Sequence, residues 1–270
     1  MVSIKEIFIY PIKGCGGIRV EQWPIEGKGL RHDRQWMLID EHHRFVSQRE
    51  ITQMALLQVC LQDSHWKVMD PRSDNHLLLP MDPQHGSAKQ VTIWDDEVTA
   101  FTYSAEANSF FSEILGIPLE LVFFGADSQR RVDPRYNTAE HQTRFSDGYP
   151  VLVLGTASLT HLNTLLPEPI SYNRFRPNVV VHTEIPHIED HWLRLQHEDF
   201  TFELVKPCSR CVVTTIDQKT AQKSPEPLKT LSSYRKFEQK INFGMNALVD
   251  IQQPQASICI GQELRPVERQ

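Results

Sequence analysis

The chain has 270 residues, of which 40% are hydrophobic and 23% charged, a composition typical of soluble globular proteins. A formal net charge of -6 argues against a general nucleic-acid binder. The sequence shows neither a signal-peptide pattern nor an apolar run of the roughly 20 residues that cross a bilayer. We therefore expect a cytoplasmic protein that binds neither nucleic acid nor membrane. Five cysteines, an odd number, do not indicate a disulfide framework in a chain of this length.

The first predicted element is a short β-strand at residues 4–10, which runs into a glycine-rich turn at residues 11–17. Closely spaced glycines let a backbone approach a ligand and expose its N–H groups. Lys13 adds a positive charge beside Gly14, but the Gly-Lys-Ser/Thr ending of a Walker loop is missing. The residues alone leave open a ligand-binding turn and a plain glycine turn with a solvated lysine.

A turn and a strand are predicted next, at residues 29–40. Arg34 lies in this turn, and a planar guanidinium suits bidentate phosphate binding. An ion pair between Arg34 and Asp33 explains the same pattern without a ligand. Residues 44–103 alternate short apolar runs with polar breaks, which predicts an antiparallel meander.

A helix is predicted at residues 105–115, where apolar residues recur at helical spacing. Ser104 is placed to be its N-cap and Gly116 to end it. We interpret the aromatic residues of this helix as core residues, not as a cofactor site. Another strand is expected at residues 119–124.

Residues 125–148 are polar and lack periodicity. Unstructured segments of this length are uncommon in compact proteins and often have a function. We interpret this segment as an interdomain connection that also forms a loop over the functional site. The predicted domains are accordingly residues 1–125 and 126–270.

A buried strand at residues 149–154 leads through Gly155 and Thr156 into an amphipathic helix. A strand, a Gly-Thr turn and a helix N-terminus together form an anion site, from free N–H groups and the helix dipole. The simpler alternative is that Thr156 only caps its own helix.

Arg176 and Asn178 stand on either side of a proline, directly before an apolar strand at residues 179–181. An arginine can hold a phosphate, and an asparagine can both donate and accept hydrogen bonds. The proline fixes φ and stiffens how the two side chains are presented.

Cys208 and Cys211 form a C-x-x-C motif with Arg210 between them. Residues 200–204 alternate apolar and polar, and residues 212–216 are β-branched, so both flanks are predicted as strands. The cysteines would then lie at a hairpin bend or a barrel rim, rigidly held and facing a cleft. Arg210 would supply a fixed positive charge that favours thiolate.

Several interpretations of the C-x-x-C motif compete. A redox pair normally opens a helix after a strand, and β-branched residues follow here. A structural zinc site needs four ligands, and no second C-x-x-C or histidine pair is suitably placed. Two simply buried thiols are a further alternative. The pattern favours a metal-binding or nucleophilic cysteine in a cleft.

The segment PCSRCVVTTID, residues 207–217, resembles the signature of MOSC-domain proteins. Within this family it is most similar to the branch with the YcbX-like bacterial proteins and the mitochondrial amidoxime-reducing component. Other segments resemble family motifs in the same order: residues 10–17 (YPxKxxxG), Arg34 (DRxW), Arg176 and Asn178 (RxN), residues 224–237 (EPLxTLxxYR) and residues 242–246 (FGxN). The resemblance covers nearly the whole chain. One departure is Gly14, where relatives often carry serine.

The resemblance implies an α+β fold, mostly antiparallel, with an N-terminal β-rich module packed on a MOSC-type β-barrel. It implies a molybdenum-pterin cofactor in the cleft between them, with Cys211 as the thiolate ligand of the metal and Cys208 close by. The residues implied to bind the cofactor are Lys13, Gly14, Arg34, Gly155, Thr156, Arg176, Asn178, Ser209 and Arg210. The domain family is also associated with pyridoxal phosphate, without any residue of this chain being assigned to it.

The implied function is a molybdenum oxidoreductase that reduces N-oxygenated compounds such as hydroxylamines and amidoximes. The chain lacks both a G-x-G-x-x-G motif and the four clustered cysteines of an iron–sulfur site, so a separate ferredoxin- or flavodoxin-type protein with its reductase is expected to donate electrons. An alternative is a carrier that passes the cofactor, or a persulfide sulfur on Cys211, to another enzyme. A zinc-hairpin protein is a third.

Overall fold

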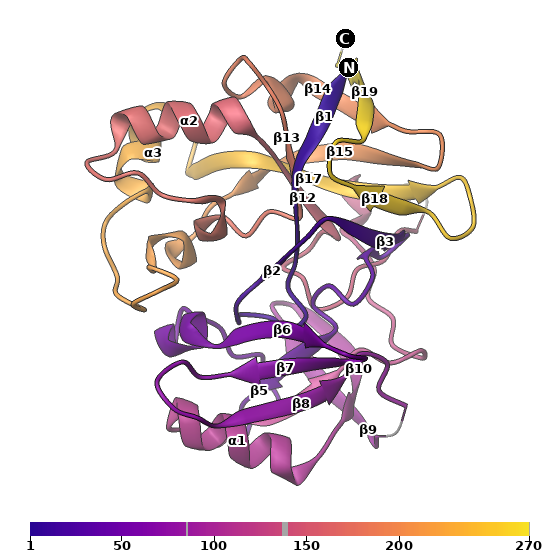
Figure 1. The fold of residues 1–270 in the computed structure, drawn as a ribbon, viewed down its shortest axis with the longest axis vertical. Coiled ribbons are helices and arrows are strands. Elements are labelled where there is room, and N and C mark those ends of the chain that lie inside the picture. Colours follow the sequence, from indigo (N-terminus) through magenta and orange to yellow (C-terminus); the bar gives the residue numbers. More distant parts are fainter. Residues whose placement is uncertain (85, 137–139, 270) are drawn as a thin grey trace.

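The computed structural model describes residues 1–84, 86–136 and 140–269. The chain forms two lobes, an N-terminal β-rich lobe and a second lobe that contains a β-barrel (Figure 1). Most strand pairs are antiparallel, and three α-helices occur among the described residues. The α+β, mostly antiparallel fold expected from the sequence is therefore confirmed.

Seven strands close into the barrel of the second lobe, because the last strand in the order pairs again with the first. Neighbouring strands are antiparallel except for the parallel pair β12 and β13. Around the barrel, the strands are β12 (Val151–Gly155), β13 (Val179–Val181), β1 (Val2–Ile9), β19 (Glu263–Glu268), β14 (Trp192–Gln196), β15 (Phe200–Ser209) and β17 (Lys240–Ile251). Two short strands, β2 (Ile18–Val20) and β16 (Lys236–Phe237), pair with β1 and β17.

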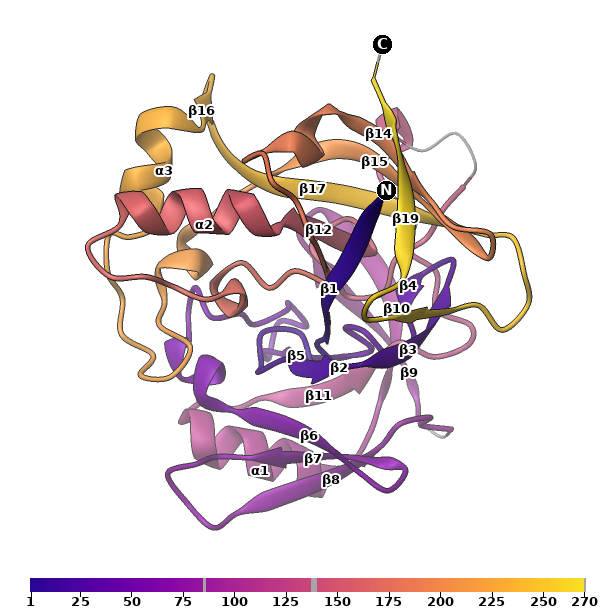
Figure 2. The ribbon, with the colours of Figure 1, turned by 45° about the horizontal axis from the view of Figure 1, so that its top comes forward.

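The first strand of the chain is part of this barrel, between β13 and β19. Figure 2 shows β1 in indigo beside β19 in yellow, and Val2 pairs with Leu264. Ile4, Ile7 and Ile9 are fully buried, which explains why this apolar strand closes the barrel. The predicted division at residue 125 stays a prediction.

The N-terminal lobe combines a four-stranded sheet with a three-stranded meander. The single meander predicted over residues 44–103 is therefore divided between two antiparallel sheets. The sheet has the order β5 (Trp36–Ile39), β11 (Glu120–Phe123), β10 (Asp96–Thr102) and β9 (Ala88–Ile93). The meander contains β6 (Gln58–Gln62), β7 (His65–Met69) and β8 (His76–Pro80). A third small sheet, β18 (Ser257–Cys259), β3 (Gln22–Glu26) and β4 (Gly29–Leu30), joins the two halves of the chain.

Helix α1 (Ala105–Leu115) begins and ends where the sequence predicts. The Ser104 hydroxyl accepts a hydrogen bond from the backbone N–H of Ala107, and Gly116 ends the helix in the left-handed region at φ 76°. The helix buries Phe111 against the lobe core. On the barrel lobe, α2 (Thr156–Leu165) and α3 (Leu228–Tyr234) share a second apolar cluster.

The polar segment that joins the two lobes is mostly irregular, with one 3-10 turn at Pro134–Tyr136. Residues 137–139 lie outside the described residues. Arg130 and Arg144 are buried despite their charge, because their guanidinium groups bond to backbone carbonyls and to carboxylates. The segment is thus anchored to the structure, and it delivers Asp147 to the cleft described below. Among the described residues, no helix combines the length and apolar character needed to cross a membrane.

Candidate functional site

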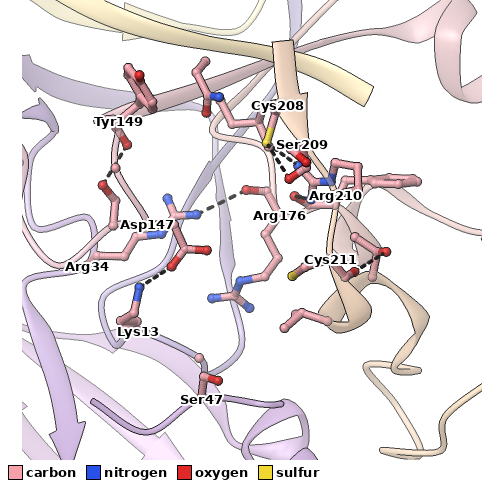
Figure 3. Close-up of a pocket in the computed structure, with 18 of the residues that line it drawn as sticks. Lys13, Arg34, Ser47, Asp147, Tyr149, Arg176, Cys208, Ser209, Arg210 and Cys211 are labelled. Carbon is pink, nitrogen blue, oxygen red and sulfur yellow. Dashed lines mark hydrogen bonds and ion pairs between the residues drawn. The ribbon is translucent and has the colours of Figure 1, made fainter. Parts of the chain in front are cut away.

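A cleft between the two lobes holds about 910 Å³ of empty space, including solvent at its open side. Figure 3 shows its two walls, with Lys13 and Ser47 on the N-terminal lobe and Cys211 on the barrel lobe. The cleft brings together eight residues implicated from the sequence: Lys13, Gly14, Arg34, Arg176, Asn178, Ser209, Arg210 and Cys211.

The C-x-x-C motif lies where strand β15 ends and a 3-10 turn, η5 (Val212–Thr215), begins. The predicted strand before the motif is confirmed, and the predicted strand after it is wrong. The Thr214 hydroxyl donates to the carbonyl of Cys211 at 2.9 Å, and the Thr215 hydroxyl donates to the carbonyl of Val212 at 2.7 Å. These local bonds close a turn and outweigh the β-propensity of the run.

Both cysteines are free thiols, and each faces a different arginine. Arg49 donates from Nη2 to the Sγ of Cys211 at 3.2 Å. Arg210 donates from Nη1 to the Sγ of Cys208 at 2.9 Å and from Nη2 to the carbonyl of Phe175 at 2.7 Å. A positive charge does lie beside Cys211, but it comes from Arg49 of the other lobe and not from Arg210 as predicted.

Arg49 is a site residue that the sequence reasoning missed. It lies in the polar run that follows Val46, a stretch with no motif and no periodicity. Ser47, Gln48 and Arg49 all line the cleft, and Gln48 donates to the carbonyl of Gly14 at 2.6 Å. Contact between this loop and a cysteine 162 residues away is a product of the tertiary fold, for which no local signal exists.

The opposite wall of the cleft carries a close ion pair, with the Nζ of Lys13 2.5 Å from Oδ1 of Asp147. Burial lowers the pKa of Lys13, and the Asp147 carboxylate opposes that shift. Partial desolvation by surrounding protein atoms would raise the pKa of Asp147, but the Lys13 ammonium and nearby arginines outweigh it and hold that pKa well below its ordinary value. The Asp147 side chain is still 66% exposed, so the pair is open to a ligand.

Gly14 is required by the backbone at the turn beside Lys13. Its φ is 86°, and a Cβ there would come within 2.7 Å of Cε of Met54. A serine at this position would therefore be strained in this chain.

Arg34 and Arg176 lie over the same aromatic ring, with their guanidinium carbons 4.3 and 4.2 Å from the Tyr10 ring centroid. Arg176 also donates to the carbonyl of Cys15 at 2.7 Å. Arg34 donates to Asp33, to Oδ1 of Asn178 and to the carbonyl of Arg176. The ion pair with Asp33, the simpler sequence interpretation, is thus present, and the same side chain also lines the cleft.

Asn178 lines the cleft, but its polar atoms are already engaged. Its Oδ1 accepts from Arg34 at 3.0 Å and from the backbone N–H of Leu152 at 3.2 Å. Its Nδ2 donates to the carbonyl of Phe8 at 3.2 Å. These bonds tie β1 to β12 beneath the cleft, so its contribution to a ligand site is to position Arg34.

Gly155 and Thr156 do not line the cleft, contrary to the prediction. The predicted anion site at the start of α2 exists, but the chain fills it with its own carboxylate. Oε1 of Glu189 accepts from the backbone N–H of Gly155 at 3.0 Å and from the Ser158 hydroxyl at 2.7 Å. The Thr156 hydroxyl donates to the carbonyl of Thr183 at 3.1 Å. Glu189 is fully buried, and burial raises its pKa.

Near Glu189, the ring nitrogens of His187 are buried and have no hydrogen-bond partner among the described residues. Burial, helped by Arg235 and His161, lowers the pKa of His187 from 6.5 to about 4. As the pH falls, the unfolded chain therefore binds a proton at His187 at a higher pH than the folded chain does. The stability contributed by neutral His187 is complete above pH 6.5 and is lost as the pH falls toward about 4.

We expect the melting temperature of the wild type to fall more steeply between pH 6.5 and 4 than that of His187→Asn. Asparagine removes the titration and tolerates the left-handed backbone at φ 63°. His43→Asn is a matched control, because His43 has a φ of 59° but is exposed. Equal slopes for the wild type and His187→Asn would contradict the expectation.

The structure is thus that of a two-lobed protein whose interlobe cleft combines a free thiol with basic residues from both lobes. Residues 1–118 match the MOSC N-terminal beta barrel domain, and residues 140–265 match the MOSC domain. Mitochondrial amidoxime-reducing component 1 of Mus musculus is 30% identical, over 86% of this chain and 71% of that protein. The chain belongs to the MOSC-domain family, as the sequence motifs indicate.

Two other relatives extend the comparison. Mitochondrial amidoxime reducing component 2 of Bos taurus is 29% identical, over 86% of this chain and 72% of that protein. Molybdenum cofactor sulfurase of Oryza sativa subsp. japonica is 27% identical, over 90% of this chain and 32% of the sulfurase. The chain thus spans about a third of the length of the sulfurase and most of the length of the amidoxime-reducing components.

Proposed function

We propose that this chain binds a molybdenum-pterin cofactor in the interlobe cleft and reduces N-oxygenated compounds such as amidoximes. The observation that carries the proposal is the position of Cys211, a free thiol in a cleft lined by basic side chains of both lobes. The names of the two amidoxime-reducing relatives support the substrate class.

The residues of the cleft fit this cofactor. Among the described residues that line it, six are lysine or arginine and one, Asp147, is acidic. Such an excess of positive charge suits a phosphate group. The buried Nε of Arg210 has no hydrogen-bond partner among the described residues, which leaves a donor available to a ligand. Cys211 adds the soft sulfur ligand that the metal needs.

Each residue then has a definable task. Cys211 would hold the metal, and Arg49 would keep the Cys211 sulfur oriented through its N–H···S bond. Lys13 and Arg176 hold the phosphate end from opposite lobes, and Arg34 is fixed by Asp33 and Asn178 to support Arg176. When bound, the cofactor would supply the two electrons that reduce the N–O bond of the substrate, whose oxygen leaves as water with two protons.

The proposal is tested with protein from a molybdenum-sufficient host, by metal and pterin analysis and by turnover of benzamidoxime with reduced viologen dye. We expect molybdenum and pterin in equal amounts and formation of benzamidine. Protein that is fully loaded with molybdenum and pterin but forms no benzamidine would refute the reductase function. Zinc in place of molybdenum would refute the cofactor as well.

We also expect no turnover with NADH alone. The sequence lacks a dinucleotide-binding G-x-G-x-x-G motif, and Cys15, Cys60 and Cys259 are too scattered to hold an iron–sulfur cluster. Adding a ferredoxin or flavodoxin with its reductase should start benzamidoxime reduction, through a contact below about 1,200 Å². Turnover with NADH as the sole reductant would reveal a nucleotide site and contradict this expectation.

A second candidate is a carrier of the cofactor or of persulfide sulfur on Cys211. The observation in its favour is the match to molybdenum cofactor sulfurases over 90% of this chain. Mass spectrometry of the intact protein separates the two functions, because a persulfide adds one sulfur atom to Cys211. A persulfide, little metal and no reductase turnover would favour the carrier. The cytoplasmic location and any pyridoxal phosphate binding stay predictions.

A further inference from the structure

An unusual residue occupies the tip of the hairpin between β9 and β10. Ile93 pairs with Asp96, which leaves Trp94 and Asp95 as a two-residue turn. Such tips usually carry Asn or Gly, because the backbone there has positive φ. Trp94 has a φ of 57° and is 39% exposed. A large aromatic side chain is thus presented to solvent at a position that does not favour one.

The Trp94 ring packs against two side chains, one of which also contacts the Cys211 thiol. The guanidinium carbon of Arg49 lies 4.3 Å from the Trp94 ring centroid, and the Phe45 ring meets it edge-on at 4.8 Å. Arg49 is the same residue that donates to the Sγ of Cys211 at 3.2 Å. One guanidinium group therefore bridges the Trp94 ring and the Cys211 sulfur.

Trp94 also lines a second groove that continues from the cofactor cleft. The two share Asp147, Gly148 and Tyr149 in their linings. The groove is bounded by the β9–β10 hairpin on one side and by residues 129–135 and Lys206 on another. A ligand that reacts in the cleft can therefore extend its unreactive part into this groove.

The free charges around Trp94 are of both signs, because Arg49 on its ring and Lys206 across the groove form no ion pair within the described residues. Arg130 pairs with Asp96 at 2.8 Å, and Arg135 pairs with Asp133 at 2.6 Å, so these groove charges are neutralised. Asp95 and Glu97, the hairpin residues on either side of Asp96, form no ion pair within the described part of the chain. With charges of both signs around it, the exposed Trp94 ring itself is the distinctive feature, and its face suits a flat aryl group.

We propose that Trp94 is a specificity-determining residue, which binds the flat aryl part of an amidoxime substrate and of its amidinium product in this groove. The inference rests on the proposed function for the reacting group, but the recognition itself needs no metal. The N-terminal lobe would then select the substrate, while the barrel lobe supplies the metal-binding thiol.

The test uses benzamidine as the probe, titrated into cofactor-free protein by calorimetry, and benzamidoxime and hydroxylamine as substrates of the loaded protein. Trp94→Asn removes the ring and tolerates positive φ, whereas Trp94→Tyr restores a ring. Phe237→Ala is the matched control, because Phe237 is a 56% exposed aromatic that also packs against an arginine, Arg235. Hydroxylamine is too small to reach the groove.

For Trp94→Asn we expect benzamidine affinity to fall about tenfold, and the KM for benzamidoxime to rise about tenfold relative to that for hydroxylamine. Trp94→Tyr should recover most of both losses, and Phe237→Ala should match the wild type. Unchanged benzamidine binding in Trp94→Asn would overturn the proposal. Trp94-dependent benzamidine binding in a protein that reduces no N-oxygenated compound would support this site and overturn the reductase function.

Discussion

Cys211→Ser is expected to abolish amidoxime reduction, whereas Cys208→Ser is expected to reduce it. Serine oxygen is a harder and far less acidic ligand than thiolate, so both the metal ligation and the redox potential should change. Cys211 lies at the start of the η5 turn and accepts an N–H from Arg49. Cys208 lies in the same cleft, but its sulfur is bonded to Arg210. Cys208 is therefore expected to affect the metal only indirectly, through the hydrogen bonds around the metal site.

The measurement is viologen-driven turnover of benzamidoxime per mole of protein, with the melting temperature as a check on folding. Neither cysteine is in a disulfide, so neither substitution removes a covalent link. Cys259→Ser is a suitable control, because this third free thiol does not line the cleft. An active Cys211→Ser protein with an inactive Cys208→Ser protein would reverse the ligand assignment.

The Lys13→Ala and Arg176→Ala proteins are expected to bind less cofactor, whereas the activity of the cofactor that stays bound should not change. Each side chain offers N–H groups to the cleft beyond those it uses on Asp147 or on the carbonyl of Cys15. A lost charge-assisted hydrogen bond costs about 1.5–3 kcal/mol, which is about a ten- to a hundredfold loss of affinity. Both proteins should purify with less pterin, and the turnover per bound molybdenum should stay near that of the wild type.

The control for charge alone is Lys236→Ala, since Lys236 is exposed and lies outside the cleft. Arg34→Ala is expected to behave differently from the two anchor variants. Its guanidinium joins Asp33, Asn178 and the backbone of Arg176, so its removal should also lower the melting temperature. Full pterin occupancy in both Lys13→Ala and Arg176→Ala would show that these residues are not cofactor anchors.

The sequence predicts much of this fold because local patterns agree with it. The cap and the stop of α1, at Ser104 and Gly116, are local chemistry that tertiary contacts do not override. The strands predicted at residues 4–10 and 179–181 correspond to β1 and β13. Their pairing with each other is a long-range event, and it brings the first strand of the chain into the barrel.

The site is harder to predict because it depends on side-chain partners. Arg49 reaches Cys211 only through the packing of the lobes, and no motif marks it. The turn at Gly155 and Thr156 has the right local chemistry for an anion, but the N–H of Gly155 donates to Glu189 and that of Ala157 to the Thr183 hydroxyl. Asn178 lies in the cleft as expected, yet its amide is engaged with β1 and β12. Local sequence predicts which groups a segment offers, and the fold decides which partners they meet.

Above all, the proposed function requires that Cys211 binds the metal of a cofactor in the cleft between the lobes. X-ray absorption at the molybdenum edge tests it most directly, because this measurement counts the sulfur atoms bound to the metal. We expect three in the wild type, two from the dithiolene of the pterin and one from Cys211, and two in Cys211→Ser. Wild-type protein without molybdenum, or three sulfur ligands in Cys211→Ser, would contradict the claim.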